Sequence, residues 1–411
     1  MSKTKKDIKS NSLSQLAWKR LKKNKLSLFG LVVIFCAVLV AVLGPLIRPD
    51  GTPKANDQIL EVTTKPPGFK VKILKVKKNH HLKEPTVWNY LNLGVENDFT
   101  TIPIYSYSFE GGTLIVEKYT GSESNNGQII RYNIADIVYA INDNEVVETN
   151  GYLDFETITE EKKHLKISEL KKTIEQKNIV IKKFILGTDK YGRDMLSRLM
   201  AGTWISLFVG FISVFISLLI GISLGALAGY FRGWIDDLVM WFINVVWSIP
   251  TLLLVIAITM ALGKGTWQVF IAVGLTMWVE VARVVRGQML SLREKEFVEA
   301  GRALGFTNAR IIFKHIIPNV LGPVIVISAI NFAAAILIEA GLSFLGIGAQ
   351  PPQATWGKII AEHKGYIITG KAYLAILPGV AIITMVLAFV LVGNGLRDSL
   401  DAKAVDDMPT V

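Results

Sequence analysis

Long apolar stretches without a charged residue constrain this chain more than any other feature of its sequence. Five such stretches cover residues 27–47, 204–230, 238–262, 319–338 and 373–396. A shorter one, 266–282, carries Glu280 near its inner end. About 20 consecutive apolar residues in a helix are enough to cross the hydrocarbon core of a bilayer. The sequence therefore predicts an all-α polytopic membrane protein with six transmembrane helices, the first over residues 28–47.

The basic residues between these stretches predict the orientation of the chain. Residues 1–27 hold nine Lys or Arg and one Asp, and the segment 283–318 holds seven Lys or Arg. The segments 263–265 and 340–372, on the other side, hold four Lys together. Cytoplasmic loops of membrane proteins carry the excess of basic residues. We therefore expect the N-terminus and the tail (399–411) to lie in the cytoplasm, an N-in, C-in arrangement.

The first apolar stretch superficially resembles a signal peptide. It is too long for the apolar core of one, and no small-residue cleavage site follows it, so we expect a retained first span. The net charge of +11 arises outside residues 51–184, which hold 18 basic and 18 acidic residues. An excess confined to membrane-flanking segments speaks against binding of nucleic acid and fits contact with membrane lipid.

Residues 48–184 separate the first span from the others and are predicted to form a polar extracytoplasmic insert. The alternating pattern at 102–119, with a Glu-Gly-Gly turn, predicts a β-hairpin. Residues 128–141 are expected to add strands, and the apolar spacing at 165–177 predicts a helix. The insert is therefore expected to be a small folded α+β domain. Its lysines do not contradict this location, because long loops are translocated largely regardless of charge.

Small residues recur every four positions along the stretch 204–230, at Ser213, Ser217, Gly221, Gly225 and Gly229. Residues four apart lie on the same face of a helix, and small side chains let two helix backbones approach closely in lipid. Glycine is frequent in transmembrane helices in any case. A run of five in register nevertheless favours a helix-packing face.

The stretch EFVEAGRALGFTNARIIFKHIIPNV (296–320) is charged and amphipathic, although it lies between two apolar stretches. Phe297, Ala300/Gly301 and Leu304 fall on one face at helical spacing, and the small residues in the middle would permit close approach of another surface. From spacing alone, an interfacial helix lying on lipid headgroups is as acceptable as a helix that docks on a protein.

The same stretch contains signals for a turn and a second helix. Gly305 is suited to end the first helix, and Thr307 or Asn308 to begin the next. Pro318 disfavours helical geometry at the residue before it, so the second helix is expected to stop before Pro318.

The pattern E-A-G-x3-G-x9-H-I-I-P in this stretch resembles the EAA loop of binding-protein-dependent ABC transporter permeases. Gly301 replaces the second alanine of that family's pattern, and His315 replaces its first isoleucine. In the family this segment is a coupling helix that seats in a cleft of a cytoplasmic ATPase subunit. The resemblance thus implies a role in ATPase coupling for Glu299, Ala300, Gly301, Arg302, Leu304, Gly305 and Pro318.

Further stretches are similar to the C-type permease of the peptide/nickel branch of that family; they are residues 18–34, 185–210, 339–360 and 394–403. The second of them carries the signature GTDxxGRD, made of Gly187, Thr188, Asp189, Gly192, Arg193 and Asp194. We expect its charged residues to order an outside loop by salt bridges rather than to contact substrate. The resemblance covers residues 1–50 and 185–403, and it says nothing about the role of the insert.

The resemblance implies the permease subunit of an importer for dipeptides or oligopeptides in the bacterial cytoplasmic (inner) membrane. The implied partners are cytoplasmic ABC ATPase subunits, a second homologous permease forming a heterodimer, and an extracytoplasmic substrate-binding protein. Residues 185–398 would form a five-helix permease core with its coupling loop at about 283–318. Permeases for nickel and for glutathione share these motifs, so both cargoes remain alternatives.

The chain itself carries no sign of an enzyme. It has no GxxxxGK[ST] phosphate loop, so ATP hydrolysis is expected on a separate subunit. Its single cysteine, Cys36, and its five scattered histidines argue for no metal site, and no cofactor is expected. A membrane-anchored sensor or enzyme acting through residues 51–184 remains an alternative, although no catalytic constellation is visible there.

Two residues within the apolar stretches are candidates for a part in transport. Pro250 removes a backbone hydrogen bond and should bend its helix, either as a hinge or as a static kink. Glu339 ends the fifth span, and we expect a structural role near the outer boundary rather than a place in a gate. An ion-coupled transporter would require ionisable groups in mid-span; apart from Glu339 and Glu280, which both lie near the ends of their spans, there are none.

Overall fold

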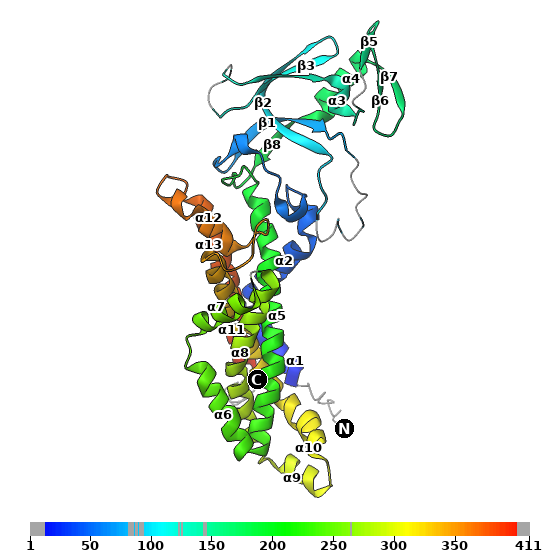
Figure 1. The fold of residues 1–411 in the computed structure, drawn as a ribbon. Coiled ribbons are helices and arrows are strands. Elements are labelled where there is room, and N and C mark those ends of the chain that lie inside the picture. The colour runs from blue at the N-terminus through cyan, green and yellow to red at the C-terminus, as the bar shows by residue number, and fades with distance from the viewer. Residues whose placement is uncertain are drawn as a thin grey trace, which may run out of the picture.

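The computed structural model describes residues 13–80, 86, 89, 94–121, 124, 126–142, 146–263 and 265–400. Within them, five helices are long and apolar enough to cross a membrane: Lys25–Ile47 (α2), Met195–Phe231 (α5), Thr266–Leu292 (α8), Asn308–Phe344 and Tyr373–Leu400 (α13). They form an elongated bundle with a sheet-containing segment at one end (Figure 1). Of the predicted terminus 1–27 and tail 399–411, residues 1–12 and 401–411 lie outside the described residues, as does Lys264.

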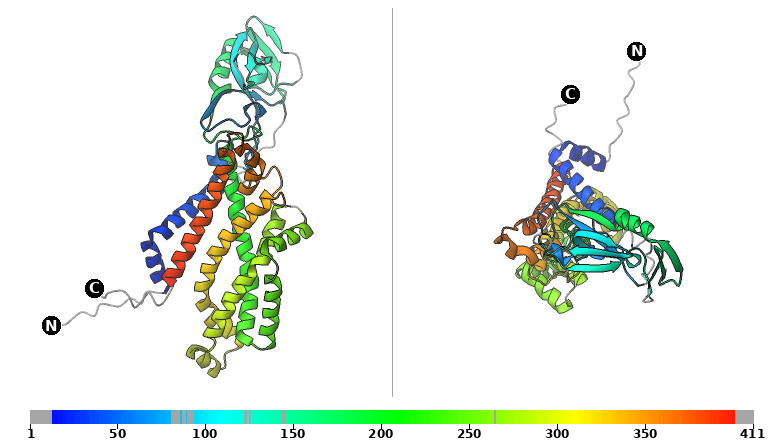
Figure 2. Two further views of the ribbon diagram at one scale, coloured as in Figure 1. Left: turned by 90° about the vertical axis from the view of Figure 1, so that its left-hand side faces the viewer. Right: turned by 90° about the horizontal axis from the view of Figure 1, so that it is seen from above.

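The bundle is centred on α5 and α8, which contact each other more extensively than any other two elements. The helix α11 (Ile317–Phe344) packs on both and on α13, and α13 packs on α2. Figure 2 shows α2 and α13 side by side at the edge of the bundle, where the short helix α1 (Leu13–Lys23) also lies. The outward face of α2 is apolar, with exposed Phe29, Val32 and Phe35. Such a surface suits lipid rather than water.

The predicted span 238–262 is broken in the structure. It consists of α6 (Trp234–Trp247) and α7 (Thr251–Leu262), which meet at 90°. Pro250 stands at the break with extended ψ of 123° and, lacking an N–H, cannot continue the hydrogen-bond ladder of α6. The bend expected at Pro250 is therefore present. The chain has up to six spans only if this bent pair counts as one.

The prediction that a helix stops before Pro318 is wrong. The chain runs helically from α10 (Asn308–Arg310) through a π-helical turn (Ile311–Ile316) into α11, where Pro318 lies in the first turn. Proline is tolerated there because first-turn N–H groups need no partner within the α-helix. The wider turn before it removes the conflict, and the Asn319 side chain donates to the His315 carbonyl at 2.7 Å.

The insert folds into two antiparallel sheets with short helices. The larger sheet has the order β4-β3-β2-β1-β8, with strands Phe69–Lys77 (β1), Phe99–Glu110 (β2), Thr113–Lys118 (β3), Ile129–Asn133 (β4) and Ile179–Phe184 (β8). The smaller sheet, in the order β5-β6-β7, comprises Val147–Thr149 (β5), Tyr152–Glu156 (β6) and Lys162–Lys166 (β7). Helices α3 (Ile134–Val138) and α4 (Ile167–Thr173), with a π-turn (Ile174–Asn178), cover one face of the larger sheet.

The structure confirms two of the three local predictions for the insert. β2 and β3 form the expected hairpin across Gly111–Gly112. The helix predicted over 165–177 is present over 167–178, because residues 165 and 166 still belong to strand β7. Residues 128–141 are strand only over β4, because Asn133 caps a helix by accepting from the Ala135 N–H at 2.9 Å.

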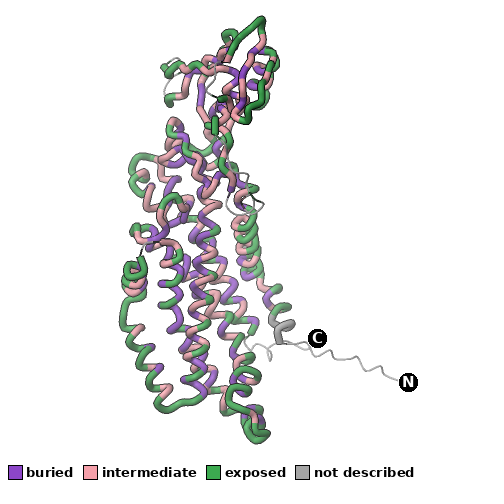
Figure 3. Tube along the Cα trace, turned by 45° about the vertical axis from the view of Figure 1, so that its right-hand side comes forward, coloured by how far each residue is buried: buried purple, intermediate pink, exposed green. Residues whose placement is uncertain are grey.

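The insert is fixed to the bundle at several points. Strand β8 leads directly into the signature loop before α5. The Lys371 ammonium donates to Thr64 Oγ1 at 2.5 Å, and the Tyr373 hydroxyl donates to the Lys65 carbonyl at 2.7 Å. Figure 3 shows the buried core of the insert as separate from the buried seam of the bundle. The two parts thus meet through polar contacts at one end of the helices.

Candidate functional site

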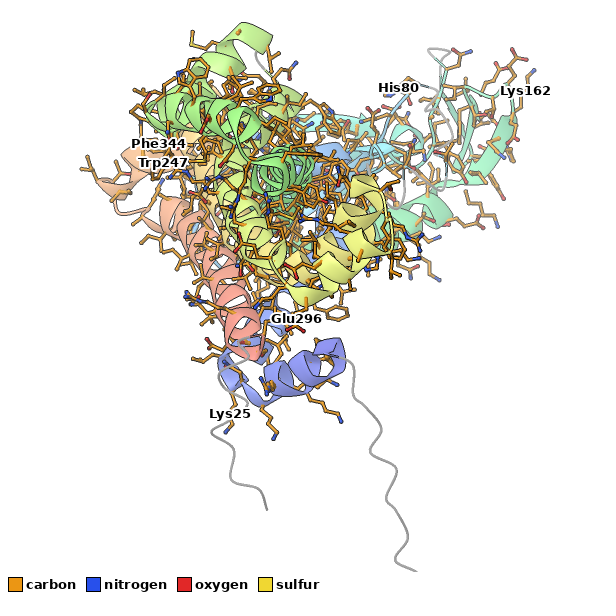
Figure 4. All side chains as sticks on the ribbon, turned by 90° about the horizontal axis from the view of Figure 1, so that it is seen from below. Lys25, His80, Lys162, Trp247, Glu296 and Phe344 are labelled. Carbon is orange, nitrogen blue, oxygen red and sulfur yellow. The ribbon has the colours of Figure 1, made fainter. Side chains whose placement is uncertain are left out.

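The stretch 296–320 lies at the end of the molecule opposite the insert (Figures 1 and 4; Glu296 is labelled in the latter). Its first helix is α9 (Glu296–Ala303). Gly305 follows with φ of +74°, a left-handed conformation that favours glycine and ends the helix. Thr307 caps the next helix and accepts from the Arg310 N–H at 3.3 Å. The expected end at Gly305 and start after Thr307 are therefore both present.

The inward face of α9 differs from the sequence-based expectation. Val298 and Gly301 are buried, whereas Phe297, Ala300 and Leu304 are exposed. A Cβ built on Gly301 would lie 3.4 Å from the Phe306 ring, so this glycine faces the protein's own loop rather than a partner. The expectation that Gly301 shares the docking face with Phe297 and Leu304 is therefore wrong.

Buried residues from four elements hold α9 in place. Val298 packs in one cluster with Ile311 and Val320 from the following helix, and with Val285 of α8. On the α5 side, the Tyr230 hydroxyl donates to Asn308 at 2.8 Å. Val298 of α9 therefore shares one buried cluster with residues of α5, α8 and α11.

Arginine side chains reinforce this attachment. Arg293 donates to the Tyr230 carbonyl at 2.6 Å, and the Arg310 guanidinium lies 3.9 Å over the Phe306 ring. Phe306 also stacks on the His315 ring, and the two ring centroids are 5.6 Å apart. Tyr230 was not singled out from sequence, because it lies at the end of another apolar stretch and only the folded chain brings it to Asn308.

The exposed face of α9 combines apolar and charged side chains. Phe297 is 42% exposed and Leu304 is 72% exposed, and Ala300 lies between them on the same face. Glu299 and Arg302 flank this apolar stripe and are exposed. Large apolar side chains rimmed by charges at the end of a molecule are typical of a protein-binding surface. We call Phe297, Ala300 and Leu304 the α9 stripe.

The small-residue stripe of α5 lies against α8 along its whole length. Ser213 donates to the Phe270 carbonyl at 3.0 Å, and Ser217 is buried and donates to Val214 within its own helix. A Cβ built on Gly221 would lie 2.5 Å from Val281 Cβ. A Cβ on Gly225 would lie 2.5 Å from the Ala282 carbonyl oxygen, and a Cβ on Gly229 would lie 2.6 Å from Met289 Cβ. No side chain larger than hydrogen fits at these three positions without moving α8.

The signature loop sits between the insert and the bundle and is almost entirely buried. Asp189 accepts from the backbone N–H groups of Tyr191 and Arg193 and pairs with the Arg193 side chain at 2.6 Å. Asp194 caps α5 by accepting from the Ser197 N–H at 2.8 Å. Thr188 donates to the Val62 carbonyl in the insert. The charged groups of the loop thus hold the loop itself and the junction with the insert.

The glycines of this loop permit a close approach of the insert. Gly187 and Gly192 have φ of +78° and +71°, and a Cβ on Gly192 would overlap the Ile59 carbonyl. Burial raises the pKa of the Asp194 carboxyl, and the hydrogen bonds from Ser197 oppose that shift. A polar loop so enclosed is a structural joint between the two parts of the molecule.

The helix α12 (Trp356–His363) closes over this loop. Glu362 lies 3.5 Å from Arg193, and the buried His363 ring is bonded on both nitrogens. His363 Nδ1 lies 2.7 Å from the Ile359 carbonyl, and Nε2 accepts from the Lys190 N–H at 3.3 Å. This pattern requires the neutral imidazole, because one nitrogen donates and the other accepts.

Acidification is expected to weaken this joint through His363. Burial lowers the pKa of His363 below its usual 6.5, so the unfolded chain binds a proton more readily than the folded one. The stabilisation of the folded chain by neutral His363 is therefore complete above about pH 6.5. It is lost as the pH falls from there toward the pKa of His363 in the folded chain. Thermal unfolding of the purified chain at pH 7.5 and 5.5 should show a fall in Tm that is smaller in His363→Gln, whose amide can form both hydrogen bonds. Equal pH dependence in both proteins would contradict this role.

The two remaining candidates differ in burial: Glu339 is buried, whereas Pro250 is exposed. Glu339 is buried in α11 and accepts from Ser343 Oγ at 2.6 Å, close to the contact between α11 and α12. Pro250 stands between Ile249 and Thr251, which both line a cavity of about 200 Å³ at the α6–α7 break. Among the described residues, no group of three or more His, Cys, Asp or Glu is placed to hold a metal ion.

Comparison with known proteins agrees with the resemblance seen in the sequence. The family model described as "binding-protein-dependent transport system inner membrane component" matches residues 221–405, and the model described as "N-terminal TM domain of oligopeptide transport permease C" matches residues 12–67. The insert lies almost entirely between these two matches.

Curated relatives match over slightly more than half of this chain. The dipeptide transport system permease protein DppC of Alkalihalophilus pseudofirmus is 42% identical over 217 residues, which are 53% of this chain and 71% of the relative. The glutathione transport system permease protein GsiD of Pectobacterium atrosepticum is 40% identical over 218 residues, 53% of this chain and 72% of the relative. The oligopeptide transport system permease protein OppC of Haemophilus influenzae is 42% identical over 217 residues, which are 53% of this chain and 70% of the relative.

A solved structure of the MetNI methionine ABC transporter in an inward-facing conformation aligns with 50% of this chain and 97% of its own, at 22% identity and a TM-score of 0.43. The family assignment rests on the sequence matches instead. Two models match in the expected order, and a relative at 42% identity is covered over 71% of its length. The chain belongs to the family of binding-protein-dependent transport system inner membrane components, in the branch of the C-type peptide transport permeases.

Proposed function

We propose that this chain is a transmembrane permease subunit of an ATP-binding-cassette importer for short peptides. The observation that carries the proposal is the α9 stripe, an apolar surface rimmed by charges and anchored to α5, α8 and α11. Its relatives are named as dipeptide, oligopeptide and glutathione permeases, which supports a peptide-like cargo. Glutathione and nickel remain alternative cargoes of the same class of importer.

In this proposal the α9 stripe seats in a cleft of a cytoplasmic ATPase subunit. Phe297 and Leu304 would be buried by the partner, while Glu299 and Arg302 would set the orientation. Movement of the ATPase on nucleotide binding would then shift α9 and, through Val298 and Tyr230, the membrane helices. The small residues of the α5 stripe would keep α5 and α8 together during that movement.

The remaining parts of the assembly follow from this role. A second homologous permease would complete the pathway as a heterodimer, and an extracytoplasmic binding protein would deliver the cargo at the end that carries the insert. The chain would span the inner membrane six times, with α6 and α7 as one broken span and both termini in the cytoplasm. The segments 48–184 and 185–398 would be the outer insert and the permease core.

Cysteine labelling tests this orientation. In a Cys36→Ala background, which removes the only cysteine, Ile129→Cys places a thiol on the insert and Ala300→Cys places one on α9. We expect a membrane-impermeant maleimide to label Ile129→Cys in intact spheroplasts and to label Ala300→Cys only after permeabilisation. The reverse pattern would invert the proposed topology. Labelling of both cysteine variants in intact spheroplasts would place the insert and α9 on the same, outer side.

Purification from the native membrane tests the assembly and the cargo together. A detergent pull-down followed by mass spectrometry should recover ATPase subunits and a second permease, and deletion of the chain should abolish ATP-dependent uptake of labelled peptides. Loss of nickel or glutathione uptake instead would select an alternative cargo. If the chain is recovered without any ATPase, the importer role fails, and a membrane-anchored sensor acting through residues 51–184 becomes the better hypothesis.

A further inference from the structure

The break between α6 and α7 opens a cavity of about 200 Å³ in the bundle. Its lining comes from both sides of the break and from α8 and α11, and it includes Trp247, Thr251, Thr276, Met277, Glu280 and Ile338. The lining combines apolar side chains with the polar groups of Thr251, Thr276 and Glu280, so the cavity offers both kinds of contact to a small molecule. Figure 4 labels Trp247, which ends α6 at this break.

Glu280 lies farther from the end of its helix than the sequence indicated. The sequence put it near the end of a stretch that stops at residue 282, but α8 continues to Leu292. Arg286 pairs with Asp236 at 2.5 Å, and Arg232 pairs with Glu294 at 2.7 Å, so this level is the polar end of the bundle. Glu280 precedes Arg286 by six residues and therefore lies about 9 Å farther from this polar end along the axis of α8.

The Glu280 carboxylate has no partner among the residues that the structure describes. Arg283, one turn along α8, is held elsewhere: it donates to Asn244 Oδ1 at 3.1 Å, and its guanidinium lies 3.5 Å over the Trp247 ring. The nearest arginine is thus kept from neutralising the carboxylate. Glu280 is exposed on the surface of this chain and also lines the cavity. Unpaired ionisable groups at membrane depth are rare, and they mark pathways for ions and substrates.

We propose that Glu280 binds the primary ammonium group of the cargo, the free N-terminus of a short peptide, as it passes the α6–α7 break. This inference rests on the proposed function, because only a transported peptide brings that group into the membrane. An ammonium placed in the cavity would pair with the carboxylate, while the apolar lining accepts varied side chains. Because every unmodified short peptide carries this ammonium, such a contact serves transport without selecting a sequence.

The test uses the whole complex, reconstituted into vesicles with its ATPases and the binding protein, and labelled trialanine as cargo. We expect Glu280→Gln to lower the maximal uptake rate about tenfold and Glu280→Lys to lower it further. Glu280→Asp should retain at least half of the rate, because it keeps the charge. The half-saturating concentration should not change in any variant, since the external binding protein sets it.

Asp237→Asn provides the matched control. It removes one carboxylate from the exposed first turn of the same broken helix, outside the cavity, and should change uptake less than twofold. Uptake by Glu280→Gln within twofold of the unmodified chain would overturn the inference. So would a loss of the second permease from purified Glu280→Gln complexes, because Glu280 would then pair with that subunit. If the unmodified complex transports no peptide, it is the proposed function that fails.

Discussion

Leu304→Asp is expected to abolish ATP-dependent uptake while leaving the chain folded in the membrane. Leu304 is 72% exposed on the α9 stripe, so its side chain contributes little to packing within the chain. In the complex it would be buried against the ATPase, where a carboxylate would lose its water without gaining a partner. Central residues of interfaces contribute about 2 kcal/mol or more each, which corresponds to about 30-fold weaker binding. Adding Phe297→Asp should remove the ATPase completely.

Two measurements separate docking from folding. The amount of ATPase that co-purifies should fall with uptake, whereas the Tm of the purified chain should remain within about 2 °C of the unmodified one. Ile129→Asp is the matched control, because Ile129 is equally exposed, at 67%, on strand β4 of the insert. It should affect neither readout. If Leu304→Asp binds the ATPase normally, the α9 stripe is not the docking surface.

The second large effect is expected from the α5–α8 contact. A Cβ at Gly225 would lie 2.5 Å from the Ala282 carbonyl oxygen and 2.9 Å from Val285 Cβ. Both atoms belong to the backbone or stem of α8, so neither can rotate away. Overpacking of this kind typically costs about 1–3 kcal/mol, and Gly225→Ala should lie at the upper end of that range. Gly225→Leu should prevent recovery of folded chain altogether.

Gly287 allows a matched comparison on the partner helix. It lies in α8, but a Cβ built there would meet no atom within 4 Å. Gly287→Ala should therefore be neutral or slightly stabilising, because alanine has the better helix propensity by up to about 1 kcal/mol. Unfolding in detergent, monitored by circular dichroism, would give the free energy of unfolding of both alanine variants. Equal stability of the two alanine variants would contradict this prediction. It would show that α5 and α8 can move apart slightly without lowering the free energy of unfolding.

The interior of the insert was predictable where local signals were strong. The hairpin of β2 and β3 follows from alternation and a Gly-Gly turn, which depend only on neighbouring residues. The helix after β4 was missed, because Asn133 begins it by capping and a short apolar run suits strand and helix equally. The assignment of residues 128–141 thus depended on a single side chain.

The α9 face shows how tertiary packing decides between neighbouring positions. Ala300 and Gly301 differ by 100° around the helix, and the sequence allowed both in the apolar stripe. The contact of Gly301 with Phe306 turned that residue inward and left Ala300 exposed with Leu304. Periodicity locates an amphipathic helix, but which edge of it faces the protein depends on its packing partners, here Phe306 in the following loop and Val285 of α8.

The number of apolar stretches, the small-residue stripe and the family motifs are local patterns, and the sequence by itself determined them. The spatial relations were not local. Glu280 and the α6–α7 break meet in one cavity because the chain turns by 90° at Pro250 and α7 packs on α8. Pro318 continues a helix because the π-turn before it accommodates the ring. Each outcome depended on packing and hydrogen bonding between helices, which a linear pattern of residue types does not encode.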